Sequence, residues 1–444
     1  MAFDGFEHPA TISNPPHAKK RKLKIPRQSS KGISKQSSSE APREQHAQSS
    51  PSPSAKALQA REKTEKRRKK LWDLLTEGFA HLPDRQQRCN RVRIAPSVQV
   101  QRWKSKIGDR CSYSGLMQCG NANICPVCAA KIRTARAREL SQLARHHWNQ
   151  EGNSSLRFMT LTIRHGKKSE LKPMLKALNG AWRKCWRRLT TKRKHLGGRR
   201  YIDVYGLKGY SKSLEVTWSE RNGFHPHLHF LLFFERDTKN ALIDSLKTRV
   251  FDLWKKYVVD DLGEEYAPTA KNGVDLRGVK GEQSPEDLAD YMVKIAFELS
   301  DPVTKTQTAK KKTSPMFNVL QMAINGSKIA AGVWAEYCEA IKGTRVYELT
   351  RTDGFFDDYK LALGMKEKTD LEIVEETEGG ELVLTIEKET WHRVCKRGKR
   401  LELLQQAEKG GSSGALDWLI KTGLWGGTLE RISCQILEPL PDWG

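Results

Sequence analysis

The sequence predicts an α+β protein, because strand patterns and helix patterns alternate between about residues 155 and 300. Residues 156–163 (LRFMTLTI) alternate apolar side chains with threonine, as a half-buried strand does. Residues 213–219 and 225–234 form two further strand patterns, separated by the polar turn Glu220-Arg221-Asn222-Gly223. Two strands joined by so short a polar turn predict a β-hairpin.

Amphipathic helices are predicted between and after these strands. Apolar residues recur at helical spacing from Leu171 to Leu189 and again over residues 242–257. A last helix begins near Ser284, which is a favourable N-cap followed by Pro285 at the first helical position. The region 151–300 is therefore expected to fold as one unit.

The composition divides the 444 residues into four segments. Residues 1–70 are rich in Ser, Gln and Pro and hold 17 Lys and Arg against 6 Asp and Glu, which predicts a disordered basic tail. Residues 71–150 hold a cysteine cluster and a basic helix, and residues 301–444 form a helical and mixed extension for DNA or partner binding. Within the tail, residues 19–24 (KKRKLK) resemble a nuclear localisation signal, although a DNA-tethering arm is the favoured interpretation.

The net charge of +26, from 78 Lys and Arg against 52 Asp and Glu, predicts a nucleic acid partner. The alternative is a basic protein whose charge serves only solubility. No apolar stretch approaches the roughly 18–20 residues of a membrane span, so no membrane association is expected. Nine unevenly spread cysteines favour a reducing compartment, the cytoplasm, and a metal cluster rather than disulfides.

A histidine-rich strand is the most informative segment. His225, His227 and His229 alternate along residues 225–234 and so point to the same face. Their spacing predicts a metal site, with Glu215 on the paired strand as a further ligand. A mixed imidazole and carboxylate set suits Mn²⁺ or Mg²⁺. Whether His225 is a ligand or only a neighbour of the site stays open. The alternative for all three histidines is that they lie in the core with their hydrogen bonds satisfied and bind no metal.

The helix that begins at Ser284 carries three reactive side chains on one face. Asp287, Tyr291 and Lys294 are spaced at i, i+4 and i+7. A tyrosine oxygen can attack phosphorus, Lys294 can stabilise the phenolate or phosphate, and Asp287 can accept a proton. The alternatives are a helix-capping Asp287, a solvated Lys294 and a tyrosine that only packs.

A cysteine cluster precedes the α/β region. Cys111, Cys119, Cys125 and Cys128 fall within eighteen residues, and four thiolates satisfy tetrahedral Zn²⁺. The sequence therefore predicts structural zinc, with buried thiols as the alternative. The remaining cysteines are scattered and receive no role: Cys89, Cys185, Cys338, Cys395 and Cys434. The basic helix that follows is expected to lie on DNA phosphates through Lys131, Arg133, Arg136 and Arg138.

Three motifs together resemble the HUH endonuclease superfamily, specifically plasmid rolling-circle replication initiators of the Rep type. Residues 158–162 (FMTLT) resemble the first strand motif, His227-Leu228-His229 the metal-binding motif, and residues 291–294 (YMVK) the nucleophile motif. Glu215 stands where relatives carry a third ligand. The resemblance covers roughly residues 110–345.

This resemblance implies a central antiparallel sheet with flanking helices, similar to ferredoxin-like and RRM-like domains. It implies that Tyr291 nicks single-stranded origin DNA, forming a 5′-phosphotyrosine link and a free 3′ hydroxyl. Some initiators with one tyrosine carry a Glu four residues before it that activates water; Asp287 stands there in this chain, beside Glu286. The expected partners are single-stranded or hairpin origin DNA and the host helicase and polymerase.

Two alternatives to a plasmid initiator remain. A transposase or mobilisation relaxase uses the same chemistry on other DNA ends. A zinc-dependent DNA-binding regulator without catalysis explains the charge and the cysteines, but it gives the histidine strand no purpose.

Overall fold

The structure is a computed structural model that describes residues 55–104, 109–152, 155–278, 313–345, 347–376 and 380–426. The chain divides into two units, Met1–Ser52 and Pro53–Gly444. All described residues belong to the second unit. The segments 71–150, 151–300 and 301–444, which the sequence treats separately, thus contribute to one unit.

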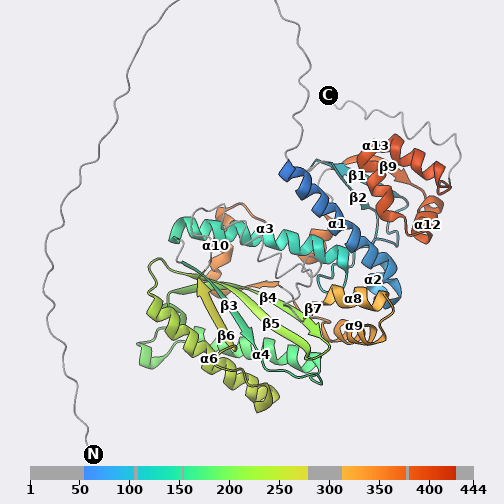
Figure 1. The fold of residues 1–444 in the computed structure, drawn as a ribbon. Coiled ribbons are helices and arrows are strands. Elements are labelled where there is room, and N and C mark those ends of the chain that lie inside the picture. Colours follow the sequence, from blue (N-terminus) through green and yellow to red (C-terminus); the bar gives the residue numbers. More distant parts are fainter. Residues whose placement is uncertain are drawn as a thin grey trace, which may run out of the picture. The chain divides into compact units, whose positions relative to one another are not determined.

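A six-stranded sheet lies at the centre of this unit (Figure 1). Its main strands lie in the order β6-β3-β5-β4, and two short strands, β7 and β8, both pair with the outer edge of β4. All of these pairings are antiparallel. The strands are β3 (Leu156–Thr162), β4 (Leu207–Ser219), β5 (Gly223–Phe234), β6 (Val274–Gly278), β7 (Ser314–Pro315) and β8 (Tyr347–Leu349).

Two helices connect these strands in a β-α-β-β-α-β order. Helix α4 (Leu171–Thr190) and the short α5 (Tyr201–Val204) lead from β3 to β4, and α6 (Asn240–Leu262) leads from β5 to β6. Both long helices lie on the same face of the sheet and pack against each other (Figure 1). The α+β class, the hairpin and the two amphipathic helices predicted from the sequence are confirmed, and the connectivity is that of the split β-α-β arrangement.

The two faces of the sheet bury different side chains. On the α4 and α6 face, Trp182 packs against Tyr210 of β4 and Phe230 of β5, with ring centroids 5.2 and 4.3 Å away. On the other face, α3 (Pro126–Glu151) packs Leu143 against Phe158 and Phe233. Because side chains alternate along β5, this second face also receives the histidines.

A second, three-stranded sheet joins segments from both ends of the described chain. Strand β1 (Val98–Trp103) pairs with β2 (Arg110–Ser114) and with β9 (Glu381–Ile386). Helices α12 (Lys388–Lys396) and α13 (Arg400–Lys421) follow β9. Helix α13 is kinked at Gly411, which has a φ of +62°.

Helix α1 (Ala55–Glu77) begins inside the segment 1–70 that the sequence marks as disordered. Its basic residues have acidic partners elsewhere in the unit, since Arg68 forms an ion pair of 2.6 Å with Glu408 of α13. Its last turns bury Leu74 and Leu75. Composition alone does not detect these distant partners, so the prediction of disorder is wrong for residues 55–70, which are helical.

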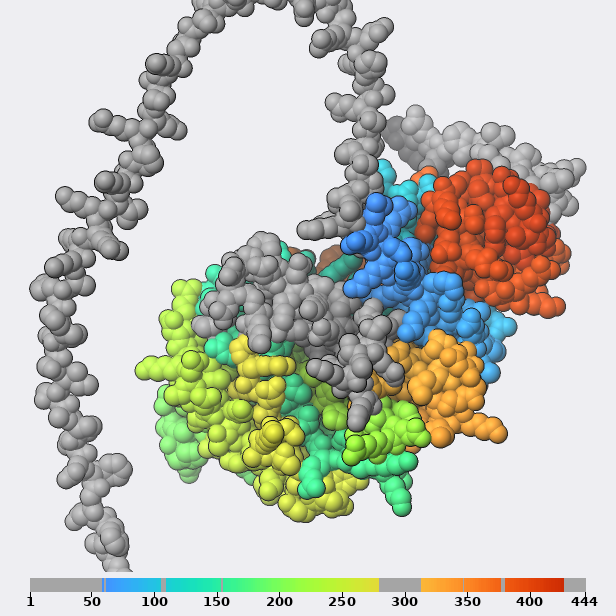
Figure 2. All heavy atoms as spheres, viewed as in Figure 1, coloured from blue at the N-terminus to red at the C-terminus, as the bar shows by residue number. Residues whose placement is uncertain are grey.

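Two helices, α8 (Met316–Ile324) and α9 (Lys328–Ala340), follow β7. They are separated at Gly326, whose φ is +94°. Trp334 of α9 donates a hydrogen bond of 2.8 Å to the carbonyl of His81, and α8 contacts α1 (Figure 2). The other described helices are α2 (Asp84–Arg88), α10 (Phe355–Ala362) and α11 (Asp370–Glu375). No helix in the described part of the chain has the length and apolar character that a bilayer crossing requires.

Candidate metal centres and the pocket beside them

The hairpin β4–β5 brings Glu215 and two histidines together. Glu215 lies directly opposite His227 in the strand register. Its Oε2 lies 2.7 Å from Nε2 of His227 and 3.0 Å from Nε2 of His229. The three candidate ligand atoms all lie within 4.8 Å of one another, so the group predicted from the sequence can hold one metal ion.

The surroundings of this group suit metal ligands. The side chains of Glu215, His227 and His229 are between 13% and 19% exposed, so they are largely but not completely buried. Nδ1 of His229 lies 3.2 Å from Oγ1 of Thr160 on β3. When Nδ1 donates its proton to Thr160, Nε2 keeps a lone pair directed at Glu215, which is the tautomer that a metal requires. Two imidazoles and one carboxylate fit a divalent cation with open coordination positions.

His225 lies beside the group rather than within it. Nδ1 of His225 is 2.7 Å from Nε2 of His165, and Nδ1 of His165 is 3.0 Å from the carbonyl oxygen of Asn222. Since that carbonyl must accept, His165 donates to it, and its Nε2 accepts from His225. Burial, with smaller contributions from His227 and His165, lowers the pKa of His225 to about 4. His165 is a neighbour of the site that the sequence patterns did not single out.

Four buried thiols form a second candidate metal centre: Cys89, Cys119, Cys125 and Cys128. The Sγ atoms of Cys89 and Cys128 are 3.4 Å apart, and those of Cys119 and Cys128 and of Cys125 and Cys89 are 3.7 Å apart. Thiolates about 2.3 Å from one tetrahedral zinc ion lie about 3.8 Å from each other. The spacing therefore fits a zinc ion.

One thiol of this group, Cys128, has surroundings that favour its thiolate form. Hydrogen bonds from Cys119, Cys125 and Cys89 lower the pKa of Cys128 well below its usual range. A thiol with a lowered pKa is present as the thiolate, the form that ligates metal.

The fourth thiol in this group is Cys89, in place of the expected Cys111. Cys111 lies on β2, where its backbone N–H donates to Oε1 of Glu408 at 2.7 Å and its carbonyl accepts from Arg68. Cys89 reaches the group because the neighbouring backbone of Asn90 bonds to the carbonyl of Met117. Cys111 is closer than Cys89 to the other three cysteines in the sequence, and this spacing predicts the wrong residue. The contact that brings Cys89 to the group joins residues far apart in the sequence, so it leaves no local sequence pattern.

The basic helix α3 does not present its four cations together. Arg136 is held by Asp370 and Glu139, at 2.9 and 3.0 Å. Lys131 donates to the carbonyl of Val374 at 3.3 Å. Arg138 is exposed, and Arg133 lines a pocket. Helix α11 therefore engages two of the four cations, and the expected contact of this helix with DNA phosphates stays a prediction.

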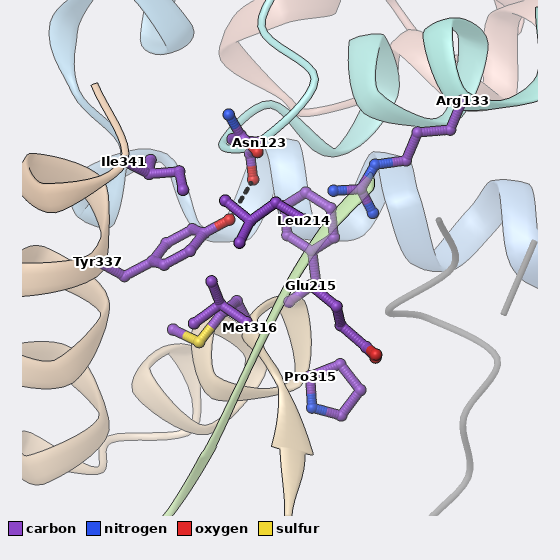
Figure 3. Close-up of a pocket in the computed structure, with 10 residues that line it drawn as sticks. Asn123, Arg133, Leu214, Glu215, Pro315, Met316, Tyr337 and Ile341 are labelled. Carbon is purple, nitrogen blue, oxygen red and sulfur yellow. Dashed lines mark hydrogen bonds between the residues drawn. The ribbon is translucent and has the colours of Figure 1, made fainter. Parts of the chain in front are cut away.

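The pocket lies between α3, β4 and the helices α8 and α9 (Figure 3). Its polar lining consists of Glu215, Arg133, Asn123 and Tyr337, and apolar side chains of β4, α8 and α9 form the rest. The Tyr337 hydroxyl donates to the carbonyl of Asn123 at 3.3 Å, which joins α9 to the loop before α3. Because Glu215 belongs to both, the pocket adjoins the candidate metal centre.

The remaining predicted site residues are Asp287, Tyr291 and Lys294. They lie outside the described residues, as does Ser284 at the predicted start of their helix. Their roles stay predictions from the sequence.

Comparisons with known proteins agree with this combination of fold and site. The family model described as Replication protein (Rep_1) matches residues 117–394. A protein named Protein rep from Streptomyces lividans is 28% identical over 352 residues, covering 66% of this chain and 76% of that protein. A Protein rep from Bacillus amyloliquefaciens is 29% identical over 199 residues, covering 42% of this chain and 52% of its own length. No solved structure matches the chain.

The matched region contains both candidate metal centres except Cys89. It covers more than half of the chain, and the chain therefore belongs to the Rep_1 family of replication proteins. The predicted resemblance to plasmid rolling-circle Rep proteins is confirmed at the level of the family.

Proposed function

We propose that this replication protein initiates plasmid rolling-circle replication by nicking single-stranded DNA at the origin, with the HUH type of nickase chemistry. The observation that carries the proposal is the Glu215–His227–His229 group, whose ligand atoms converge from two paired strands. Membership of a replication protein family supports the choice of DNA as substrate. The host helicase and polymerase are the proposed partners once a 3′ hydroxyl is free.

In the proposed mechanism, Glu215, His227 and His229 hold Mn²⁺ or Mg²⁺. Held by these three side chains, such a cation would supply polarisation of a phosphodiester and would offset the negative charge that develops during attack. Thr160 orients His229 through Nδ1, and the packed strands fix all three side chains against reorientation. Rigid ligands favour the reactive geometry because little has to be ordered during the reaction.

Tyr291 is the proposed nucleophile. Its phenol oxygen attacks phosphorus, the Tyr–O–P bond forms, and the bond from phosphorus to the 3′ oxygen breaks. The 3′ oxygen takes up a proton, and the 5′ phosphate stays on the tyrosine. Lys294, one helical turn away in the sequence, stabilises the phenolate or the phosphate, and Asp287 accepts a proton when water later attacks.

The cysteine group is the proposed site of a structural Zn²⁺. Cys125 and Cys128 lie at the start of α3, so a metal ion held there would fix the beginning of this helix. The helix packs on the histidine-bearing face of the sheet. Structural zinc sites contribute directly to folding free energy.

The test is a denaturing gel of the full chain incubated with Mn²⁺ and single-stranded origin DNA. We expect a covalent protein–DNA adduct that is absent for Tyr291→Phe. We also expect an initial rate reduced roughly 100-fold for Glu215→Ala, since a lost metal ligand removes several kcal/mol of transition-state stabilisation. Two matched controls should behave as wild type: Tyr201→Phe, beside Arg249 on the α6 face, and Glu220→Ala at the exposed hairpin turn.

An adduct that persists in Tyr291→Phe would assign the nucleophile elsewhere. The absence of adduct and cleavage with several origin-derived strands would favour a non-catalytic DNA-binding protein. In the same assay, Asp287→Ala is expected to form the adduct normally and to release it more slowly. Unchanged release would leave Asp287 as a helix cap only.

A further inference from the structure

The outward side of helix α4 carries a row of exposed cations that neither candidate metal centre accounts for. Lysines and arginines recur along this helix at spacings of four, seven and four residues. With 3.6 residues per turn, these spacings place the side chains within about 60° of one another around the helix axis. The exposed members of this α4 row are Lys172, Lys176, Arg183 and Arg187.

The α4 row keeps its positive charge. Residues 171–202 contain no Asp or Glu, so the helix itself supplies no counter-charge. Among the residues that the structure describes, no carboxylate forms an ion pair with a member of the row. Lys184, on the neighbouring side of α4, shows the contrast, since it pairs with Asp261 of α6 at 2.5 Å.

The positive surface continues beyond the end of α4 into a compact loop, residues 191–200. Two backbone hydrogen bonds close this loop. The N–H of Arg193 donates to the carbonyl of Arg199 at 3.0 Å, and the N–H of Gly198 donates to the carbonyl of Arg193 at 2.9 Å. The loop therefore has a defined shape. Its exposed cations are Lys192, Lys194 and Arg199.

The α4 row and the histidines belong to opposite faces of the central sheet. Helix α4 packs on one face through Trp182, which contacts Phe230, whereas α3 covers the face that receives the histidines (Figure 1). The row lies roughly 130° around the axis of α4 from the buried side chains of Leu178 and Trp182, so it points away from the sheet. A phosphate at the candidate metal centre and a phosphate at the row must therefore belong to different parts of a DNA molecule.

The chemistry of the row suits the backbone of a duplex better than a single strand. Surfaces that bind single strands add aromatic side chains on which the bases stack. The aromatic residues of α4 are Trp182 and Trp186, and neither is exposed. The row also extends along about 22 Å of helix, and duplex DNA presents one phosphate charge for about every 1.7 Å of its axis. A straight row of cations and a rigid polyanion are complementary in charge.

We propose that the α4 row binds the phosphate backbone of double-stranded DNA, independently of base sequence, on the face of the sheet opposite the histidines. Contacts to phosphates position a protein on DNA without selecting a base sequence. In the replication of a plasmid, this duplex is the part of the origin that flanks the nicked strand. That assignment rests on the proposed nickase function, whereas the duplex contact itself does not.

The test measures binding in EDTA, which removes divalent cations. Anisotropy follows a fluorescein-labelled duplex of roughly 20 base pairs, which exceeds the row at about 3.4 Å per base pair. Each phosphate contact to a duplex contributes about 0.9 to the slope of log affinity against log salt. We expect Arg183→Gln combined with Arg187→Gln to reduce this slope by about 1.8. Arg183→Lys combined with Arg187→Lys should preserve the slope, because the contact requires only the charge.

The matched control is Lys184→Gln combined with Arg188→Gln. It removes the same charge from the same helix, but these two side chains bind Asp261 and the Tyr257 hydroxyl of α6, at 2.5 and 3.0 Å. The control should keep the wild-type slope. Oligothymidylate replaces the duplex in a parallel titration, where we expect no loss of slope in either double variant. Melting temperatures establish that the variants fold.

A wild-type duplex slope in the folded Arg183→Gln and Arg187→Gln protein would overturn the proposal. An equal loss of slope with oligothymidylate would contradict the assignment to duplex DNA. An equal loss in the control would attribute the effect to net charge and not to the row. Should the double variant fail to fold, Arg187→Gln alone decides, with an expected loss of about 0.9.

Adduct formation with Mn²⁺ separates this inference from the nickase. At subsaturating DNA, the variant should lower the rate on an origin strand flanked by duplex, relative to the rate on the bare strand. At about 0.1 M salt we expect this ratio to fall roughly 10- to 60-fold, since a slope change of about 1.8 then acts over a tenfold range of salt. Loss of duplex slope without adduct from any protein, wild type included, would support the row and contradict the nickase.

Discussion

The thiol of Cys89 lies among three other thiols and accepts a hydrogen bond of 3.3 Å from the backbone N–H of Cys119. The amide of Asn90 donates to the same sulfur, also at 3.3 Å. These two donors hold the Cys89 sulfur beside the other three thiols, with all four sulfur atoms within 4.8 Å of one another. A residue that is 30 positions from its nearest partner in the group thus has the surroundings of a metal ligand.

These surroundings lead to a prediction about zinc content. Cys89→Ser should lower zinc in the purified chain from about one ion to well below one, because a serine hydroxyl is a poor zinc ligand. Cys111→Ser is the matched control, since Cys111 is equally buried but lies on β2. It should retain zinc. Metal analysis by mass spectrometry gives the result, and equal zinc in both variants would contradict the assignment of Cys89.

At the scale of secondary-structure elements, α3 links the cysteine group to the central sheet. It starts at Pro126, directly after Cys125, and near its other end it buries His147 against the sheet. Nε2 of His147 donates to the carbonyl of Phe234, at the end of β5, at 3.0 Å. Nδ1 then accepts from the hydroxyl of Tyr359 on α10, at 2.8 Å. The histidine is therefore held in its neutral form.

Burial lowers the pKa of His147 to about 4, and this predicts a pH dependence of stability. Between about pH 6.5, where an unfolded histidine titrates, and about pH 4, the unfolded chain binds a proton that the folded chain does not. The free energy of unfolding must therefore fall as the pH drops through this window, by up to about 3 kcal/mol. Above about pH 6.5 the full contribution is present.

Urea unfolding at pH 7 and pH 5 measures this effect. The wild type should lose about 2 kcal/mol more between the two values than His147→Gln, whose amide can still donate to Phe234 but does not titrate. The carboxylates change the free energy of unfolding with pH equally in both proteins, so their contribution cancels when the two proteins are compared. The same pH dependence in both proteins would show that His147 takes up its proton without unfolding.

The elements that the sequence predicts well are those with a local signal. The hairpin of β4 and β5 and the helices α4 and α6 have a clear period of two or of 3.6 residues. The predicted bounds of α4 and β5 lie within two residues of those observed, whereas β4 begins six residues earlier than predicted and α6 ends five residues later. The pair Glu215 and His227 follows from the register of that hairpin. A short turn fixes which residues face each other, so this part of the site is already determined by local sequence.

At the scale of the whole molecule, the features that the sequence does not reveal are those formed by distant segments. Strand β9 completes the sheet of β1 and β2 across more than 270 residues, with Val98 paired to Ile386. Asp370 lies in a segment whose acidity suggests a solvated surface, yet it neutralises Arg136. Such contacts form only when the unit Pro53–Gly444 folds, and no local pattern of apolar residues in the sequence predicts them.

The outer edge of β4 is covered by β7 and β8, which pair with Trp218 and Ser211 through Ser314 and Leu349. These partners follow the hairpin by roughly a hundred residues, so at about 5–20 residues per second a ribosome needs on the order of ten seconds to supply them. During that interval the backbone donors and acceptors of β4 can pair with another nascent chain. A chain that ends before residue 313 should accordingly accumulate in the insoluble fraction of a translation reaction, while the full chain stays in the supernatant. We therefore expect a period during synthesis in which the β4–β5 hairpin avoids aggregation only through chaperones or through rapid completion of the chain.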